Sequence, residues 1–192
     1  SIQTQPVAYD KTGESHYDVI SAFIKSIRGS DPHAAVYYLA RMLEGGEDPK
    51  FIARRLLISA SEDIGLANPT ALVMATNAFL AVERIGMPEG RIVLAQCTIY
   101  LATSAKSNAS YAAIAAATSA VRQEGDLPIP LSLRNAPTDL MKELGYGSGY
   151  AYDHDADGGF SGQELMPEAL KGQAFYHPGK NPREQQLLAQ LQ

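Results

Sequence analysis

The sequence contains a single cysteine, Cys97, and no tryptophan. One thiol cannot form an internal disulfide, and no histidine or second cysteine lies near it at the spacing of a metal site. This cysteine usage predicts a reducing, cytoplasmic environment. No segment approaches the ~18 consecutive apolar residues of a membrane-spanning helix, and the N-terminus lacks the basic-then-apolar pattern of a secretory signal. We therefore expect neither membrane insertion nor export.

Charged residues are also few. They make up 19% of the 192 residues, against 45% hydrophobic residues, which excludes a disordered chain and predicts a packed core. The net charge is -5, and residues 135–192 contain 4 basic and 8 acidic side chains. A domain that binds DNA by neutralising phosphates would normally be basic. Charge alone therefore does not predict a nucleic-acid-binding surface.

The usual catalytic signatures are missing from the 192 residues. There is no G-x-x-x-x-G-K-[ST] phosphate loop, no G-x-S-x-G elbow and no H-E-x-x-H pair. We expect no enzymatic activity and no cofactor in this chain.

Repeated Asp-Pro and Asn-Pro pairs, which favour helix starts, and glycines, which favour helix ends, predict an all-α multi-helix bundle. Six helices are expected, over residues 15–28, 32–44, 49–65, 69–85, 88–105 and 107–125. The short connections favour packing of neighbouring helices as hairpins. The sixth segment is rich in alanine, which would let another helix approach closely and indicates either a central helix or an interface.

The amino-acid composition changes after Gly125. Pro128 and Pro130 interrupt helical hydrogen bonding, and the following segment is irregular and rich in glycine, tyrosine and proline. A short helix is expected near residues 137–144, and residues 182–191 would form either a terminal helix or a loose tail.

One acidic segment matches the ligand spacing of a calcium-binding EF-hand loop. Asp153, Asp155, Asp157 and Glu164 fit D-x-D-x-D-G-x5-E, with Gly158 at the turn. However, an EF-hand needs flanking helices, and the glycine-rich residues 145–150 cannot supply one. We favour a solvated acidic turn, with calcium binding as the alternative.

Basic and polar residues offer contacts for DNA or for another subunit. They are Arg54, Arg55, Arg91, Lys106, Ser107, Asn108 and Arg134. For Arg54 and Arg55 we favour pairing with carboxylates of adjacent helices or helix capping. Residues 106–108 would either start the sixth helix or form a polar cluster at a subunit boundary.

Several strings closely resemble the C-terminal region of the replication-associated recombination protein A family. These bacterial AAA+ ATPases, also called RarA or MgsA, are similar to the eukaryotic Werner-helicase-interacting protein. The strings include KSIRGSDP (25–32), YLARMLE (38–44), ASEDIGLA (60–67), GMPEGR (86–91), KSNA (106–109), LRNAP (133–137) and LMKELGYG (140–147). The resemblance runs from about Tyr9 to Pro178.

The resemblance implies a longer, DNA-dependent AAA+ ATPase that uses ATP and Mg at motifs outside this chain. Residues 1–13 would leave the ATPase lid, residues 14–178 would form a helical oligomerisation domain similar to the clamp-loader collar, and residues 179–192 would be the C-terminal tail. The family implies a homotetramer that works in the bacterial cytoplasm at nucleoid-associated replication forks, in recombination and repair, with DNA and single-stranded DNA-binding protein as partners.

Two positions depart from the family pattern. Family members often have proline before Lys-Ser-Asn, where this chain has Ala105, and basic residues where it has Ser148 and Ala151. The second departure weakens a role of that segment in DNA contact. Three hypotheses therefore remain, in this order: a homotetramerisation domain, a module that binds DNA or single-stranded DNA-binding protein, and a calcium-binding loop.

Overall fold

The computed structural model describes residues 13–155 and 162–191. Within these ranges the regular secondary structure is entirely helical, so the all-α expectation is confirmed. The chain divides into two compact units. The first comprises residues 1–114 and 176–192, and the second comprises residues 115–175. No described helix is both long and apolar enough to span a bilayer.

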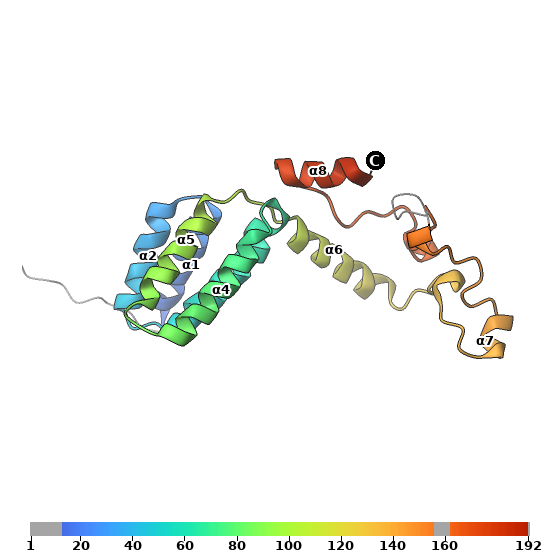
Figure 1. The fold of residues 1–192 in the computed structure, drawn as a ribbon, viewed down its shortest axis with the longest axis horizontal. Coiled ribbons are helices and arrows are strands. Elements are labelled where there is room, and N and C mark those ends of the chain that lie inside the picture. Colours follow the sequence, from blue (N-terminus) through green and yellow to red (C-terminus); the bar gives the residue numbers. More distant parts are fainter. Residues whose placement is uncertain (1–12, 156–161, 192) are drawn as a thin grey trace, which may run out of the picture. The chain divides into compact units, whose positions relative to one another are not determined.

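The first unit is a helical bundle (Figure 1). Its α-helices are α1 (Glu14–Arg28), α2 (Pro32–Glu44), α3 (Pro49–Ser59), α4 (Thr70–Ile85), α5 (Gly90–Thr103), the start of α6 (Ala109–Glu124) and α8 (Pro182–Leu191). Sequence neighbours pack against each other in the pairs α1–α2, α3–α4 and α4–α5, as the short connections predicted. Residues 182–191 form helix α8, so of the two alternatives offered by the sequence, a terminal helix or a loose tail, the helix is confirmed.

Asp-Pro pairs start two of these helices, as predicted. The Asp31 carboxylate accepts a hydrogen bond from the Ala34 N–H at 3.0 Å, and Asp48 accepts one from the Lys50 N–H at 2.9 Å. Proline occupies the first helical position after each cap, where its missing N–H leaves no hydrogen bond unmade.

The third predicted helix ends at Gly65, but its last turn is not α-helical. After α3 the chain forms a π-turn, η1 (Ala60–Ile64), and a 3-10 turn, η2 (Gly65–Ala67). Gly65 has a φ of +50°, a conformation that L side chains rarely adopt, so it ends the helix. The π-turn places Asp63 inside the protein, where it contacts other segments.

The predicted start of the fifth helix is wrong by two residues. Pro88 follows a cis peptide bond with Met87, and α5 begins at Gly90. This helix is the centre of the bundle, because it packs against α1, α2, α3 and α4. The largest fully buried apolar side chains come from α5 itself and from α1, α2, α3 and η1, and they are Phe23, Ile27, Met42, Ile52, Leu56, Ile64, Leu94 and Leu101. Burial of each such side chain stabilises the fold by about 1.5–3 kcal/mol.

The alanine-rich α6 is not the central helix, so the first of its two sequence interpretations is wrong. Ala112, Ala115 and Ala116 are exposed, whereas only Ala109 and Ala120 are buried among the described residues of this helix. The physical reason is that small side chains supply little apolar area, and α5 with its larger side chains fills the core instead. The interface interpretation of α6 remains open.

The second unit contains most of α6, the short helix α7 (Asp139–Glu143), and the 3-10 turns η3 (Leu131–Leu133), η4 (Asp153–Asp155) and η6 (Glu168–Leu170). Thr138 caps α7 by accepting a hydrogen bond from the Met141 N–H at 3.2 Å. The Gly147 N–H donates to the Leu131 carbonyl at 2.6 Å and so joins two irregular stretches. The expectation of an irregular segment with one short helix is confirmed for the described residues.

Candidate functional site

The Lys106-Ser107-Asn108 segment between α5 and α6 is a polar junction. The Lys106 ammonium donates hydrogen bonds to the Ser104 and Ala102 carbonyls at 2.6 and 3.0 Å, and to the Ser30 hydroxyl at 3.0 Å. Burial lowers the pKa of Lys106, and the nearby Asp63 carboxylate opposes that effect. Ser30 has a φ of +62°, and Lys106 contacts it directly. The junction therefore connects the start of α6 to the end of α1.

Asp63 lies at the centre of this junction. Its carboxylate accepts a hydrogen bond from the Arg28 Nε at 2.9 Å, and its backbone carbonyl accepts one from the Ser107 N–H at 2.8 Å. The Asp63 side chain is 6% exposed, whereas that of Arg28 is 49% exposed. The hydrogen bond with Asp63 raises the pKa of Arg28. The Asp63 Oδ2 atom is buried and has no hydrogen-bond partner among the described residues.

The C-terminal segment reaches the same junction through Glu184, whose side chain is fully buried. Its carboxylate accepts hydrogen bonds from the Tyr176 hydroxyl at 2.8 Å, the Gly179 N–H at 3.0 Å and the Asn181 amide at 2.8 Å. Burial raises the pKa of Glu184, but hydrogen bonds from Ser107, Gly179, Asn181 and Tyr176 outweigh it and lower the pKa to about 2. Glu184 is therefore an ionised carboxylate inside the protein.

An apolar groove lies beside the junction, where α3, η1, α4 and the start of α6 meet. We call it the α6 groove. It encloses about 620 Å³ and is lined by Leu57, Ile58, Ser61, Glu62, Leu72, Ser110, Tyr111 and Ile114. Its larger apolar side chains are partly or mostly exposed, with 44% for Ile58, 46% for Leu72 and 66% for Ile114. Water therefore contacts a continuous apolar surface here.

The apolar surface continues along α6. Tyr111, Ile114, Thr118 and Val121 follow one another at spacings of three, four and three residues, and so lie on one face of the helix. We call this set the α6 stripe. Tyr111, Ile114 and Val121 are each more than half exposed. Contiguous exposed apolar surface of this kind commonly marks a protein interaction site.

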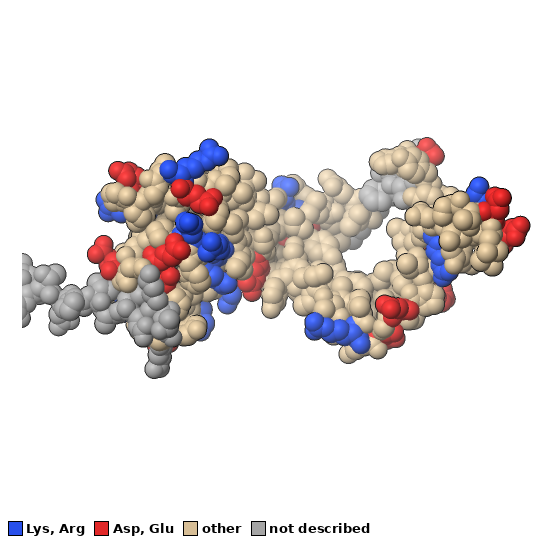
Figure 2. All heavy atoms as spheres, turned by 90° about the horizontal axis from the view of Figure 1, so that it is seen from below, with Lys and Arg blue, Asp and Glu red and all other residues tan. Residues whose placement is uncertain are grey.

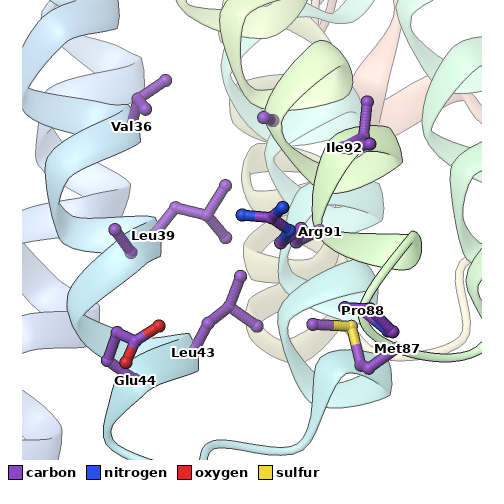
Figure 3. A pocket seen from close by; sticks show the side chains of 10 residues that line it. Val36, Leu39, Leu43, Glu44, Met87, Pro88, Arg91 and Ile92 are labelled. Atoms are coloured by element: carbon purple, nitrogen blue, oxygen red, sulfur yellow. The ribbon is translucent and has the colours of Figure 1, made fainter.

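A second groove runs between α2 and α5 and encloses about 600 Å³. Figure 3 shows Val36, Leu39 and Leu43 on its α2 wall and Met87, Pro88 and Ile92 on the opposite wall. Glu44 and Arg91 add one charge of each sign to an otherwise apolar lining. This α2–α5 groove is a further apolar hollow of the first unit.

Comparisons with known proteins identify the chain. Residues 29–192 match the family model described as MgsA AAA+ ATPase C terminal, and residues 1–28 match the model described as AAA C-terminal domain. The chain belongs to the MgsA AAA+ ATPase C-terminal family.

Curated relatives extend this family across bacteria and a eukaryote. The chain is 52% identical to Replication-associated recombination protein A of Coxiella burnetii over 88% of the chain and 39% of that protein. It is 44% identical to the Bacillus subtilis protein of the same name over 99% of the chain and 45% of that protein. It is 43% identical to ATPase WRNIP1 of Dictyostelium discoideum over 91% of the chain and 20% of that protein. The chain thus spans less than half the length of each of these relatives.

Three of the strings that carry the resemblance to the MgsA family meet at the polar junction. Arg28 and Ser30 come from the first, Asp63 from the second, and Lys106 and Ser107 from the third. Asn108 is exposed, and its carbonyl accepts a hydrogen bond from the Ala112 N–H at 2.9 Å, which starts α6. Residues 106–108 therefore directly precede α6, as the helix-start alternative expects, and their place at a subunit boundary stays a prediction.

The other basic residues considered for DNA or subunit contact lie apart from this junction. The Arg54 guanidinium stacks over the Phe79 ring at 5.8 Å, and neither Arg54 nor Arg55 pairs with a carboxylate within the described residues. The Arg55 Nε is buried without a hydrogen-bond partner there. Arg91 lines the α2–α5 groove. The expected pairing of Arg54 and Arg55 with carboxylates is therefore not found.

Arg134 belongs to the second unit. Its Nε donates to the Ile129 carbonyl at 2.9 Å, and its guanidinium stacks over the Tyr146 ring at 4.9 Å. On the face shown in Figure 2, basic and acidic side chains are interspersed. Most of the basic residues considered thus have partners inside their own unit.

The acidic loop lies partly outside the described residues, because Asp157 and Gly158 fall in the gap 156–161. Asp153 and Asp155 belong to the 3-10 turn η4, and the Glu164 carboxylate accepts a hydrogen bond from the Met166 N–H at 3.0 Å. Among the described residues, no group of three or more metal-ligating side chains is suited to an ion.

Sequence reasoning missed Glu184, although a signal was present. Asn181-Pro182-Arg183-Glu184 has the spacing of a capping box, in which the cap residue precedes a glutamate by three positions. Asn181 does cap α8 by accepting a hydrogen bond from the Glu184 N–H at 2.9 Å. What the sequence does not reveal is that the same carboxylate also contacts Ser107.

Proposed function

We propose that this chain is the self-association domain of an AAA+ ATPase of the MgsA family, and that it forms a homotetramer. The observation that carries the proposal is the α6 groove with the exposed stripe that continues from it. A monomer would leave this apolar surface in water, and burial of such surface stabilises association by about 25 cal/mol for each Å² removed from water.

The whole protein would be a DNA-dependent ATPase that uses ATP and Mg. Its relatives are named for replication-associated recombination and, in one case, as an ATPase. The proposal places the protein in the bacterial cytoplasm at nucleoid-associated replication forks, with DNA and single-stranded DNA-binding protein as partners. Residues 1–13 would lead from the ATPase lid, residues 14–178 would be the oligomerisation domain, similar to the clamp-loader collar, and residues 179–192 would be its C-terminal tail. In this proposal the chain would mediate assembly of the protein, and the residues that hydrolyse ATP would lie outside it.

Multi-angle light scattering on the 192-residue chain tests the assembly. We expect about four times the monomer mass of 20.6 kDa at tens of micromolar chain. A strictly monomeric mass at that concentration would overturn the proposal, because an obligate interface of about 2,000 Å² or more does not dissociate there.

The competing hypothesis, that this chain itself binds DNA or single-stranded DNA-binding protein, has less support. The net charge is -5, and Arg54, Lys106 and Arg134 each contact a partner within their own unit. Titration of the chain into forked DNA at two salt concentrations separates the hypotheses. Affinity that falls steeply with salt would favour DNA binding, because such binding releases counterions from phosphates.

A further inference from the structure

From the α6 stripe we infer that α6 pairs in antiparallel orientation with α6 of a second copy. This inference rests on the proposed self-association and names the element that carries one of its interfaces. The spacing of Tyr111, Ile114, Thr118 and Val121 is that of the apolar positions of a two-helix coiled coil. A second copy is therefore the occupant that this helix face fits.

The stripe determines which residues meet. In an antiparallel pair, Tyr111 of one copy would face Val121 of the other, and Ile114 would face Thr118, so both layers are filled at once. The buried alanines Ala109 and Ala120 lie on the other side of the helix, whereas Tyr111, Ile114 and Val121 of the stripe are exposed and Thr118 is half-buried. Ala115 and Ala117 flank the stripe, and their small side chains allow a close approach of the two helices.

Charge favours the antiparallel arrangement over the parallel one. Glu62 and Tyr111 both line the α6 groove, and Arg122 directly follows Val121. Antiparallel pairing would place Arg122 of the second copy beside Glu62. Parallel pairing would instead bring like charges together and would align the two helix dipoles unfavourably. Neither side chain forms an ion pair within the described part of the chain.

A cysteine-pair experiment tests the register. The double variant Ile114→Cys/Thr118→Cys places thiols that face each other across the antiparallel pair. Its control, Ala112→Cys/Ala116→Cys, has the same spacing on exposed positions of the opposite side of α6. The native Cys97 is buried, and burial raises its pKa to about 12, so it does not compete. Mild oxidation followed by denaturing electrophoresis without reductant measures the covalent dimer.

We expect at least tenfold more covalent dimer from the stripe pair than from its control. Equal yields from the two variants, with a wild-type chain that still self-associates by light scattering, would overturn the α6 pairing and leave the proposed function standing. A monomeric wild-type chain would overturn both. The two failures are therefore distinguishable.

A charge exchange gives an independent measurement. Arg122→Glu and Glu62→Arg should each weaken self-association about tenfold by sedimentation, because each places like charges together across the pair. The double variant should recover most of the wild-type affinity. Additive loss in the double variant would contradict the predicted contact, and circular dichroism would verify that each variant is folded.

Discussion

The Tyr176 hydroxyl lies 2.8 Å from a carboxylate oxygen of Glu184 and donates a hydrogen bond to it. Burial, followed by this hydrogen bond, raises the pKa of Tyr176 to about 12. The pair holds the C-terminal segment in the first unit, next to the segment that starts α6. This contact concerns the stability of the fold, whereas the proposed assembly uses the α6 groove and the α6 stripe, so the two can be tested separately.

Substitution Glu184→Gln should remove a pH-dependent part of the stability. The folded-state pKa of about 2 lies below the ~4.3 of an unfolded glutamate. The contribution is therefore full above about pH 5 and is lost as the pH falls towards 2. At neutral pH we expect a loss on the order of 3 kcal/mol. Urea unfolding of wild type and variant between pH 7 and 2 measures it, and the difference between their free energies of unfolding should shrink as the pH falls below about 5.

The matched control is Glu168→Gln, which makes the same chemical change at an exposed position. It should change the free energy of unfolding by less than about 0.5 kcal/mol at any pH. A similar loss of unfolding free energy in both variants would show that burial of the Glu184 carboxylate does not cause the effect.

Arg28 and Asp63 should respond unequally to substitution. Arg28→Met leaves the Asp63 carboxylate buried and unpaired, whereas Asp63→Asn leaves the half-exposed Arg28 in water. Arg28→Met should lower the free energy of unfolding by about 3 kcal/mol or more, and Asp63→Asn should lower it by about 1–2 kcal/mol. Denaturant unfolding of both variants compares these losses. The reverse order would mean that Asp63 is stabilised mainly by groups other than Arg28.

Lys106→Met should destabilise the polar junction, because the Ala102 and Ser104 carbonyls and the Ser30 hydroxyl lose their shared donor. We expect a loss of about 1–2 kcal/mol and faster amide hydrogen exchange over residues 104–110. Lys25→Met, at an exposed position of α1, is the control and should leave both quantities unchanged. Unchanged exchange in the Lys106 variant would contradict the assigned contacts.

Leu72→Glu should reduce the mass of the assembly, because it places a charge in the α6 groove. Val73→Glu is the matched control, since Val73 is the next residue of α4, is 57% exposed and does not line the groove. Light scattering should show dissociation at tenfold higher concentration for the Leu72 variant alone. Equal effects of both changes would place the interface elsewhere on α4.

The helices of the first unit could be predicted from the sequence because their signals are local. Asp31 and Asp48 cap helices through backbone groups two or three residues away, so nearby residues suffice to identify them. Pro88 misled the same reasoning, because a proline that favours a helix start also occurs in the loop before one. The central-helix alternative for α6 failed for another reason, since alanine content indicates how closely another helix can approach and not which helix approaches.

The candidate site was predictable only in part. Lys106 and Ser107 attracted attention as a polar string, but their partners Ser30, Asp63 and Glu184 are distant in the sequence. Such contacts depend on how the bundle closes, which no local pattern encodes. The α6 stripe is the opposite case, because its spacing can be read directly from the sequence once α6 is known to be exposed.

The position of Glu184 has a consequence for biosynthesis. A ribosome releases the chain from its first residue onward, so α1 to α6 emerge before the carboxylate that Ser107 contacts. The hydrogen bond between Ser107 in the α5–α6 loop and Glu184 can therefore form only after residue 184 has been translated. Copies that pair through the α6 stripe before that moment would do so while the neighbouring polar junction still lacks the contact with Glu184.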